Sequence, residues 1–300
     1  MNPFHAIVLA VVQGITEFIP VSSSAHLILV PYFLGWPDQG LAFDVATHAG
    51  TLLAALLYFR RDVRELVVGF FSGREASAEA GFNPRRLGWA LVVGTVPAGI
   101  FGLLFHHAVE TQARNPLLIA GTSIGYGLLL AAADRIGRRT REIGEIGLSA
   151  ALVIGFAQAL ALVPGTSRSG ITITAALLLG FSRPAAARFS FLLVIPVSAL
   201  AALHDGYKLA TGAVPSSQAL PMAIGVVVSA LVGYLVIGWL LAFLRRQSLT
   251  VFVAYRLALG VIILAVVLWR GTPVRQASER GLQQALSGLR KPIDNSLLVR

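Results

Sequence analysis

The sequence predicts an all-α polytopic membrane protein, with six transmembrane helices plus two re-entrant helical hairpins in an inverted-topology repeat. Of its 300 residues, 56% are hydrophobic and 13% are charged, and the mean hydropathy is +0.75. Soluble chains carry about 25% charged residues, so this chain has too few to cover a soluble surface, which excludes a cytosolic enzyme. Cysteine is absent, which excludes a disulfide framework, a thiolate metal site and a cysteine nucleophile.

Six apolar segments are long enough to cross the ~30 Å hydrocarbon core of a bilayer as helices of about 20 residues. They are residues 41–59, 87–106, 116–134, 188–204, 220–244 and 250–269. Two further apolar regions are broken near their middle. Residues 4–35 are broken by Pro20 and a serine run, and residues 146–181 by Pro164, Gly165 and a second hydroxyl-rich run. Each half is too short or too polar for a span, so each region is predicted to be a re-entrant hairpin.

The basic residues predict the orientation, since cytoplasmic loops of membrane proteins are enriched in Lys and Arg. Arginines gather in residues 60–86 and 135–141, whereas residues 36–40 have no basic residue and residues 107–115 and 205–219 have one each. This alternation holds only if each broken region enters and leaves on one side, which puts both termini outside. The net charge of +10 therefore indicates topology rather than a nucleic-acid partner.

The two broken regions align at an offset of 144 residues, which places Pro164 on Pro20. Each break follows an apolar helix with a glutamine and precedes three spans. Because three crossings are an odd number, the second copy is inverted, and the hairpins meet near the midplane as in many secondary transporters. The expected units are a single integral membrane domain over 1–270, with inverted repeats over about 1–135 and 146–270, and a flexible polar tail over 271–300.

Three charged residues lie in apolar sequence. Glu17 is the only acid well inside an apolar segment, Arg168 lies in the second break, and Arg256 lies about one turn from the cytoplasmic end of the last span. Arg256 is expected to snorkel to the interface. An ionisable group buried in a membrane is costly, so Glu17 and Arg168 are predicted to be functional. A structural ion pair between the two hairpins is the alternative interpretation.

Polar side chains surround both predicted functional residues. They are Gln13, Ser22, Ser23, Ser24 and His26 in the first hairpin, and Thr166, Ser167, Ser169, Thr172 and Thr174 in the second. Helix starts offer free N–H groups that bind phosphate, and a guanidinium matches phosphate oxygens, so the combination predicts phosphate chemistry. An N-cap role is the alternative for Ser22 or Ser23. His26 is a candidate base, acid or nucleophile, and His48 is considered as a further residue of the same cavity.

The segments QGITEFIPVSSSAH (Gln13–His26) and PGTSRSGIT (Pro164–Thr172) resemble the two signature motifs of the undecaprenyl-diphosphate phosphatase, or bacitracin-resistance, family. The resemblance implies an integral membrane phosphatase that converts undecaprenyl diphosphate to undecaprenyl phosphate and inorganic phosphate, recycling the lipid carrier for peptidoglycan synthesis and giving bacitracin resistance. It also implies the bacterial plasma (inner) membrane, an active site on the periplasmic side, and a divalent cation, Mg²⁺ or Ca²⁺. The expected partners are undecaprenyl diphosphate and membrane lipid, with a homodimer as the assembly considered.

The expected site consists of catalytic Glu17, Ser23, His26 and Arg168 and phosphate-binding Gln13, Ser22, Ser167 and Thr172. In one mechanism Ser23 is the nucleophile, and Glu17 or His26 removes its proton. In the other, His26 is the nucleophile or acid and Glu17 is the ligand of the cation. The family pattern has Glu or Gln where this chain has Gln13, which leaves a single carboxylate for the metal. A lipid-carrier flippase or secondary transporter, and a non-catalytic scaffold, are the alternative functions.

Overall fold

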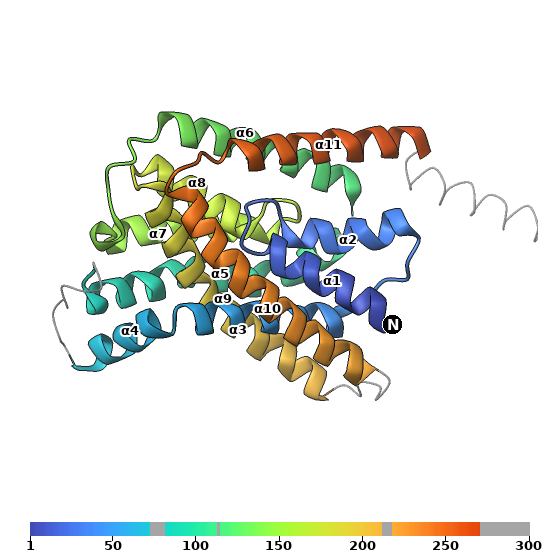
Figure 1. The fold of residues 1–300 in the computed structure, drawn as a ribbon, viewed down its shortest axis with the longest axis horizontal. Helices are drawn as coiled ribbons and strands as arrows, with labels where there is room; N and C mark the ends of the chain where they lie inside the picture. The colour runs from blue at the N-terminus through green and yellow to red at the C-terminus, as the bar shows by residue number, and fades with distance from the viewer. Residues whose placement is uncertain (73–81, 113–114, 212–217, 271–300) are drawn as a thin grey trace, which may run out of the picture.

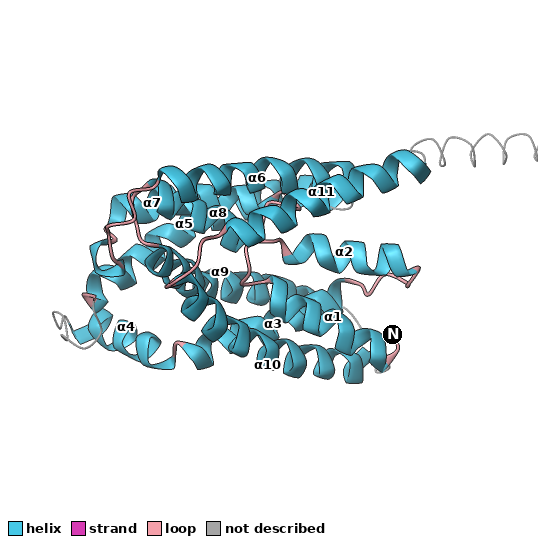
Figure 2. Cartoon of the chain, turned by 45° about the horizontal axis from the view of Figure 1, so that its top comes forward, coloured by secondary structure: helices cyan, strands magenta, loops and turns pink. Residues whose placement is uncertain are grey.

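The computed structural model describes residues 1–72, 82–112, 115–211 and 218–270. These residues form helices joined mostly by short loops, and no strand is found among them (Figures 1 and 2). The helices are α1 (Pro3–Thr16), α2 (Ser23–Leu34), α3 (Leu41–Tyr58), α4 (Arg60–Ser72), α5 (Pro84–Gln112), α6 (Pro116–Ile136), α7 (Leu148–Ala159), α8 (Arg168–Leu178), α9 (Arg183–Thr211), α10 (Ala219–Leu244) and α11 (Thr250–Arg270), with 3₁₀ turns at Ile143–Glu145 and Leu160–Leu162. The predicted all-α class is confirmed.

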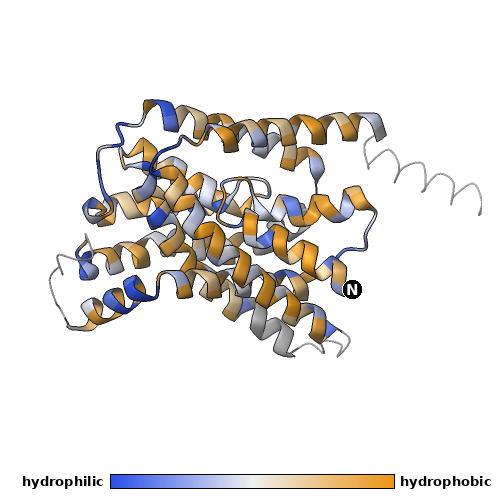
Figure 3. Cartoon of the chain, in the orientation of Figure 1, coloured by the Kyte–Doolittle hydropathy of each residue, from blue (hydrophilic) through white to orange (hydrophobic). Residues whose placement is uncertain are grey.

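Six of the described helices, α3, α5, α6, α9, α10 and α11, are long and apolar enough to cross a membrane. They coincide with the six predicted spans. The largest difference at the start of a span is at α9, which begins at Arg183 rather than at residue 188. Apolar residues dominate the middle of these helices (Figure 3). The chain is therefore a multi-pass membrane protein.

Helix α4 was not predicted, because its arginines were assigned to a loop. Its first half carries Arg60, Arg61 and Arg64, and its second half carries Val67 and Phe71, two apolar side chains that are exposed. The helix is also tied to α9, since the Arg188 side chain on α9 donates to Asp62 at 2.7 Å. A helix that combines arginines with exposed apolar side chains is typical of a membrane interface.

The two broken regions form two helical hairpins, α1–α2 and α7–α8. Their helices have 14, 12, 12 and 11 residues, fewer than the ~20 that a span needs. In Figure 1 the outer ends of α1–α2 lie on the right, beside the N-terminus, whereas those of α7–α8 lie on the left, and both breaks lie between them. This arrangement is consistent with re-entrant hairpins that enter from opposite faces.

Helix packing follows the pairing that two inverted repeats would produce. Helix α1 packs on α10 as α7 packs on α5, and α6–α11 and α3–α9 pair across the repeats. The domain limits stay a prediction, and the predicted tail over 271–300 lies outside the described residues.

The backbone at the two breaks shows the register of the repeat. Ser22 (φ 76°, ψ 100°) and Ser167 (φ 71°, ψ 114°) precede α2 and α8 in nearly the same left-handed conformation, and they are 145 residues apart. The same offset aligns Gln13 with Gln158. The offset of 144 residues from the sequence is therefore wrong by one, because it aligned the two prolines rather than the turns that start the helices.

Candidate active site at the two helix breaks

Glu17 lies just after the last residue of α1, and its side chain is only 2% exposed. Its Oε1 atom pairs with Nη2 of Arg168, from the start of α8. Its Oε2 atom accepts hydrogen bonds from Ser23 Oγ at 2.6 Å and from Gln13 Nε2 at 3.0 Å. The structure thus brings together four predicted site residues, three from the first hairpin and one from the second.

Arg168 is held from two sides. Besides Glu17, its guanidinium contacts Ser198 on α9, where Nη1 donates to the hydroxyl at 3.0 Å. The arginine side chain is 19% exposed, so part of it remains open to a ligand. A guanidinium has five N–H donors, and the pairs with Glu17 and Ser198 leave others free for phosphate oxygens.

The serines that precede the two helices differ in what their side chains do. Ser167 Oγ accepts a hydrogen bond from Gly170 N at 3.1 Å and caps α8. Ser22 makes no side-chain cap, so the first turn of α2 has no side chain on its N–H groups. Ser22 therefore occupies the predicted N-cap position, but its hydroxyl does not cap the helix. Uncapped N–H groups at a helix start are suited to bind an anion such as phosphate.

Thr172 lies one turn into α8, apart from the acid. Its hydroxyl donates to the Arg168 carbonyl at 2.8 Å and contacts the Ser190 hydroxyl at 2.6 Å. The side chain is 1% exposed. Thr172 thus lies behind the arginine in the packing of α8 on α9.

His26 points away from Glu17. Its Nδ1 atom lies 2.7 Å from the Ser22 carbonyl oxygen and its Nε2 atom 2.6 Å from the Tyr255 hydroxyl. Among the described residues, no hydrogen bond joins His26 to Ser23 or to Glu17. Of the two bases considered for Ser23, only Glu17 contacts its hydroxyl. Tyr255 was missed by the sequence analysis, because a tyrosine in an apolar span carries no distinguishing signal.

His48, which was considered from the sequence, does line the site. Its Nε2 atom lies 3.7 Å from Glu17 Oε2, and its side chain is 37% exposed. Its Nδ1 atom donates to the Asp44 carbonyl at 2.8 Å, which orients the ring. His48 is therefore a solvent-accessible side chain beside the buried Glu17 carboxylate.

Arg256 does not snorkel, and this prediction is wrong. The residue is 1% exposed, and within the described residues every hydrogen bond of its side chain goes to a backbone carbonyl. The acceptors are Pro20 (3.2 Å) in the first break, Gly165 and Thr166 (both 2.9 Å) in the second, and Thr122 (3.3 Å) and Ser123 (3.2 Å) on α6. Carbonyls at a helix break have no partner within the helix and no water inside a membrane, so a buried guanidinium satisfies them. The sequence showed Arg256 as a charge within an apolar span, but it did not show which carbonyls the side chain contacts.

The residues suited to a hard cation are few. No group of three or more His, Cys, Asp or Glu residues that could hold a metal ion occurs in the described part of the chain. The Gln13 Oε1 atom is buried and has no hydrogen-bond partner in the part of the chain that the structure describes. It lies on the side chain that contacts Glu17. Amide and carboxylate oxygens are ligands that Mg²⁺ and Ca²⁺ accept.

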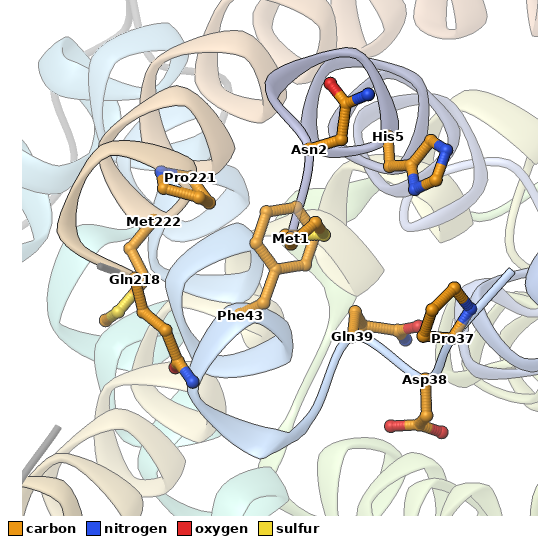
Figure 4. A pocket seen from close by; sticks show the side chains of 10 residues that line it. All are labelled: Met1, Asn2, His5, Pro37, Asp38, Gln39, Phe43, Gln218, Pro221 and Met222. Carbon is orange, nitrogen blue, oxygen red and sulfur yellow. The ribbon is translucent and has the colours of Figure 1, made fainter. Parts of the chain in front are cut away.

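A cavity of about 370 Å³ lies apart from the breaks, beside the first residues of α1, α3 and α10 (Figure 4). It is lined by Met1, Asn2, His5, Pro37, Asp38, Gln39, Phe43, Gln218, Pro221 and Met222. None of the predicted site residues belongs to this lining, so the cavity and the cluster around Glu17 are separate features.

Comparison with known proteins finds relatives that match most of the chain. The family model described as "Bacitracin resistance protein BacA" matches residues 6–262, which include both breaks. A Geobacter metallireducens protein named undecaprenyl-diphosphatase is 52% identical over 268 residues, covering 89% of this chain and 99% of the relative. A Teredinibacter turnerae protein of the same name is 50% identical over 270 residues, covering 89% and 100%. Undecaprenyl-diphosphatase 2 of Stutzerimonas stutzeri is 51% identical over 269 residues, covering 89% and 98%.

Proposed function

This chain belongs to the bacitracin resistance protein BacA family, and we propose how its two helix breaks carry out the reaction. The chain hydrolyses undecaprenyl diphosphate to undecaprenyl phosphate and inorganic phosphate. This activity fits recycling of the lipid carrier for peptidoglycan synthesis, and bacitracin resistance. Both hairpins supply residues to the reaction.

The terminal phosphate of the substrate binds between Arg168 and the uncapped first turn of α2, while the prenyl chain stays in lipid. Ser23 Oγ attacks the terminal phosphorus, and Glu17 Oε2 receives the hydroxyl proton. The bond from phosphorus to the bridging oxygen breaks, and undecaprenyl phosphate leaves with that electron pair. Water then hydrolyses the phosphoserine, which gives inorganic phosphate and restores Ser23. Arg168 and the N–H groups stabilise charge on the equatorial oxygens in both steps.

One observation carries this assignment: Ser23 donates its hydrogen bond to Glu17 at 2.6 Å, while Glu17 is paired with Arg168. These contacts support a site in which the first hairpin supplies the nucleophile and its base and the second supplies the phosphate-binding guanidinium. The alternative, with His26 as nucleophile or acid, has less support, because both ring nitrogens are engaged by Ser22 and Tyr255.

The test is phosphate release from a C55 or shorter prenyl diphosphate by the purified chain and by Ser23→Ala. We expect Ser23→Ala to lose nearly all turnover, while Ser149→Ala, which alters an exposed serine at the start of α7, retains full activity. Equal activity of Ser23→Ala and the unchanged chain would exclude the serine mechanism. Binding of the lipid without phosphate release by any preparation would favour the flippase or transporter alternative.

We propose that Mg²⁺ or Ca²⁺ binds with the substrate, with the Gln13 amide oxygen and the Glu17 carboxylate as the protein's ligands and substrate oxygens and water as the others. The orphaned Gln13 oxygen supports this proposal. A bound cation would neutralise charge on the diphosphate. Chelator should therefore reduce phosphate release, and added Mg²⁺ or Ca²⁺ should restore it. Gln13→Leu should need more cation for half-maximal activity, and an unchanged requirement would remove Gln13 from the ligand set.

We propose the bacterial inner membrane as the location, with the site open to the periplasmic side. The hydrophilic segments gather at the left of Figure 3, opposite the N-terminus and the open ends of α1–α2, which supports this orientation. The chain has no cysteine, so a single exposed Asp38→Cys should be labelled from outside and Arg138→Cys only after the membrane is opened. The reverse result would overturn the orientation. Cross-linking of the same variants in membranes tests the homodimer.

A further inference from the structure

Two neighbouring residues of α11 reach the first break. Arg256 donates to the Pro20 carbonyl, and Tyr255 contacts His26 on α2. The Tyr255 hydroxyl lies 2.6 Å from His26 Nε2, and the two rings are stacked with centroids 5.6 Å apart and planes 15° apart. This contact joins residues 229 positions apart in the sequence, and the phosphatase mechanism above assigns no step to it.

The contacts of His26 decide which atom carries which proton. A carbonyl oxygen can only accept, so the Ser22 carbonyl requires the proton on Nδ1 of His26. A neutral imidazole then has its lone pair on Nε2, and Tyr255 donates its hydroxyl hydrogen to that lone pair. The chain of hydrogen bonds therefore runs from Tyr255 through His26 to the backbone of Ser22.

Ser22 is the residue whose backbone conformation needs this support. Its φ of 76° lies in the left-handed region, which is unfavourable for a residue with a side chain unless its surroundings hold it there. At the second break, Ser167 has the same conformation but caps its own helix through Gly170. The position that corresponds to His26 is Ile171 there, which has no polar side chain. At the first break, the left-handed serine is therefore held by the His26 imidazole and the Tyr255 hydroxyl. At the second break, the corresponding Ser167 is held by its own hydrogen bond with Gly170.

We propose that Tyr255 is a positioning residue of the phosphatase site. By holding His26, it holds the Ser22 carbonyl turned toward the ring and keeps the first turn of α2 free of a side-chain cap. The N–H groups of that turn are then available to the terminal phosphate, so this inference rests on the proposed function. Tyr255 itself does not touch the substrate.

Tyr255→Phe is the direct test, because it removes the hydroxyl and keeps a ring that can stack on His26. We expect kcat for phosphate release from a prenyl diphosphate to fall about tenfold, the equivalent of one hydrogen bond in a polar network. The matched control is Tyr234→Phe, a partly exposed tyrosine of α10 whose ring contacts Tyr58. It should retain full activity. An unchanged kcat in Tyr255→Phe would overturn the proposal.

A double-variant cycle separates positioning from a general packing role. If Tyr255 acts through His26, then Tyr255→Phe should have no further effect on kcat in a chain that already carries His26→Gln. Independent, multiplicative losses would show that the tyrosine acts by another route and would overturn the proposal.

A spectroscopic measurement tests the contact without relying on activity. With ¹⁵N-labelled histidine, the signals of His26 are identified among six histidines by their absence in His26→Gln. Tyr255→Phe should shift His26 Nε2 toward the position of a nitrogen without a hydrogen bond, while Tyr234→Phe should not. An unmoved signal would overturn the proposal. If Ser23→Ala were fully active, the proposed mechanism would fail, yet this shift would still report whether Tyr255 holds His26.

Discussion

The two helix breaks have nearly the same backbone and carry different chemistry. In each, a left-handed serine starts a helix, and its hydroxyl lies close to a second serine hydroxyl two residues on, at 3.2 Å for Ser22–Ser24 and 3.3 Å for Ser167–Ser169. The first break leaves its helix start uncapped, whereas the second caps it with Ser167. The same turn is therefore suited to bind an anion when its N–H groups are free, and it has only a structural role when a side chain caps them.

The helices before the breaks show the same division. Gln13 donates to Glu17 at 3.0 Å. Gln158, at the same register, is 2% exposed, and neither of its amide atoms has a hydrogen-bond partner among the described residues. The residue that corresponds to Glu17 is Leu162, which cannot accept its hydrogen bond. The glutamine thus belongs to both copies of the repeat and the acid to only one. In the proposed mechanism, the first break provides the base Glu17 and the nucleophile Ser23, and the second provides Arg168.

Glu17→Gln should have the largest effect, because it removes the carboxylate that only the first break has. Loss of a general base lowers the rate by about 10²–10⁴, so turnover should nearly vanish in a phosphate-release assay. The control is Glu145→Gln, whose side chain is 55% exposed on the short turn before α7, and it should retain full activity. Substantial activity in Glu17→Gln would mean that the first break is not the catalytic one.

Arg168 should come next, because it is the contribution of the second break. Arg168→Lys keeps a charge but loses the planar fork, and loss of one transition-state contact corresponds to about 10²–10³ in rate. Arg168→Ala should lose more. Phosphate release measured on both variants gives the ranking. Equal activity of the lysine variant and the unchanged chain would show that a point charge suffices.

The pair Glu17–Arg168 can also be tested as a unit. The double variant Glu17→Gln, Arg168→Gln leaves no unpaired buried charge, so its melting temperature should recover relative to the single variants. Its phosphate release should stay as low as theirs if both residues act in the reaction. Recovered activity in the double variant would instead support the structural ion pair considered from the sequence.

Arg256→Met should affect both breaks together, because one guanidinium serves carbonyls of each. Removing the donors leaves buried carbonyls unsatisfied at about 1–3 kcal/mol each, so unfolding should become easier by at least ~2 kcal/mol. Thermal unfolding in detergent measures this loss. Arg245→Met, at the exposed end of α10, is the control and should change stability little; a similar loss in both would remove the special role of Arg256.

The smallest effect should distinguish the two serines. Ser167→Ala removes an N-cap, which costs about 1 kcal/mol, whereas Ser22→Ala removes no cap and should cost only a few tenths in the same unfolding measurement. An equal loss of unfolding free energy in the two variants would contradict the finding that Ser167 caps its helix and Ser22 does not.

The sequence by itself determined the spans, the breaks and the charges at them. Span length depends on bilayer thickness, and a charge such as Glu17 within apolar sequence is conspicuous because burying it is costly. Both properties are local to a segment. They were enough to place the six spans and to select Glu17 and Arg168, which the structure pairs. Ser23, which contacts Glu17, was selected instead from the hydroxyl-rich motif around the first break.

Tertiary structure alone decided how those segments are held. The sequence assigned Arg256 to the membrane interface and left α4 as a loop, and it had no reason to choose Tyr255 or to turn His26 away from Ser23. Each depends on packing: Arg256 meets Pro20 across 236 residues of sequence, and Tyr255 meets His26 across 229. A backbone carbonyl has the same chemistry in every residue, so no side-chain pattern can show which carbonyls a break leaves unsatisfied or which helix will supply the donor.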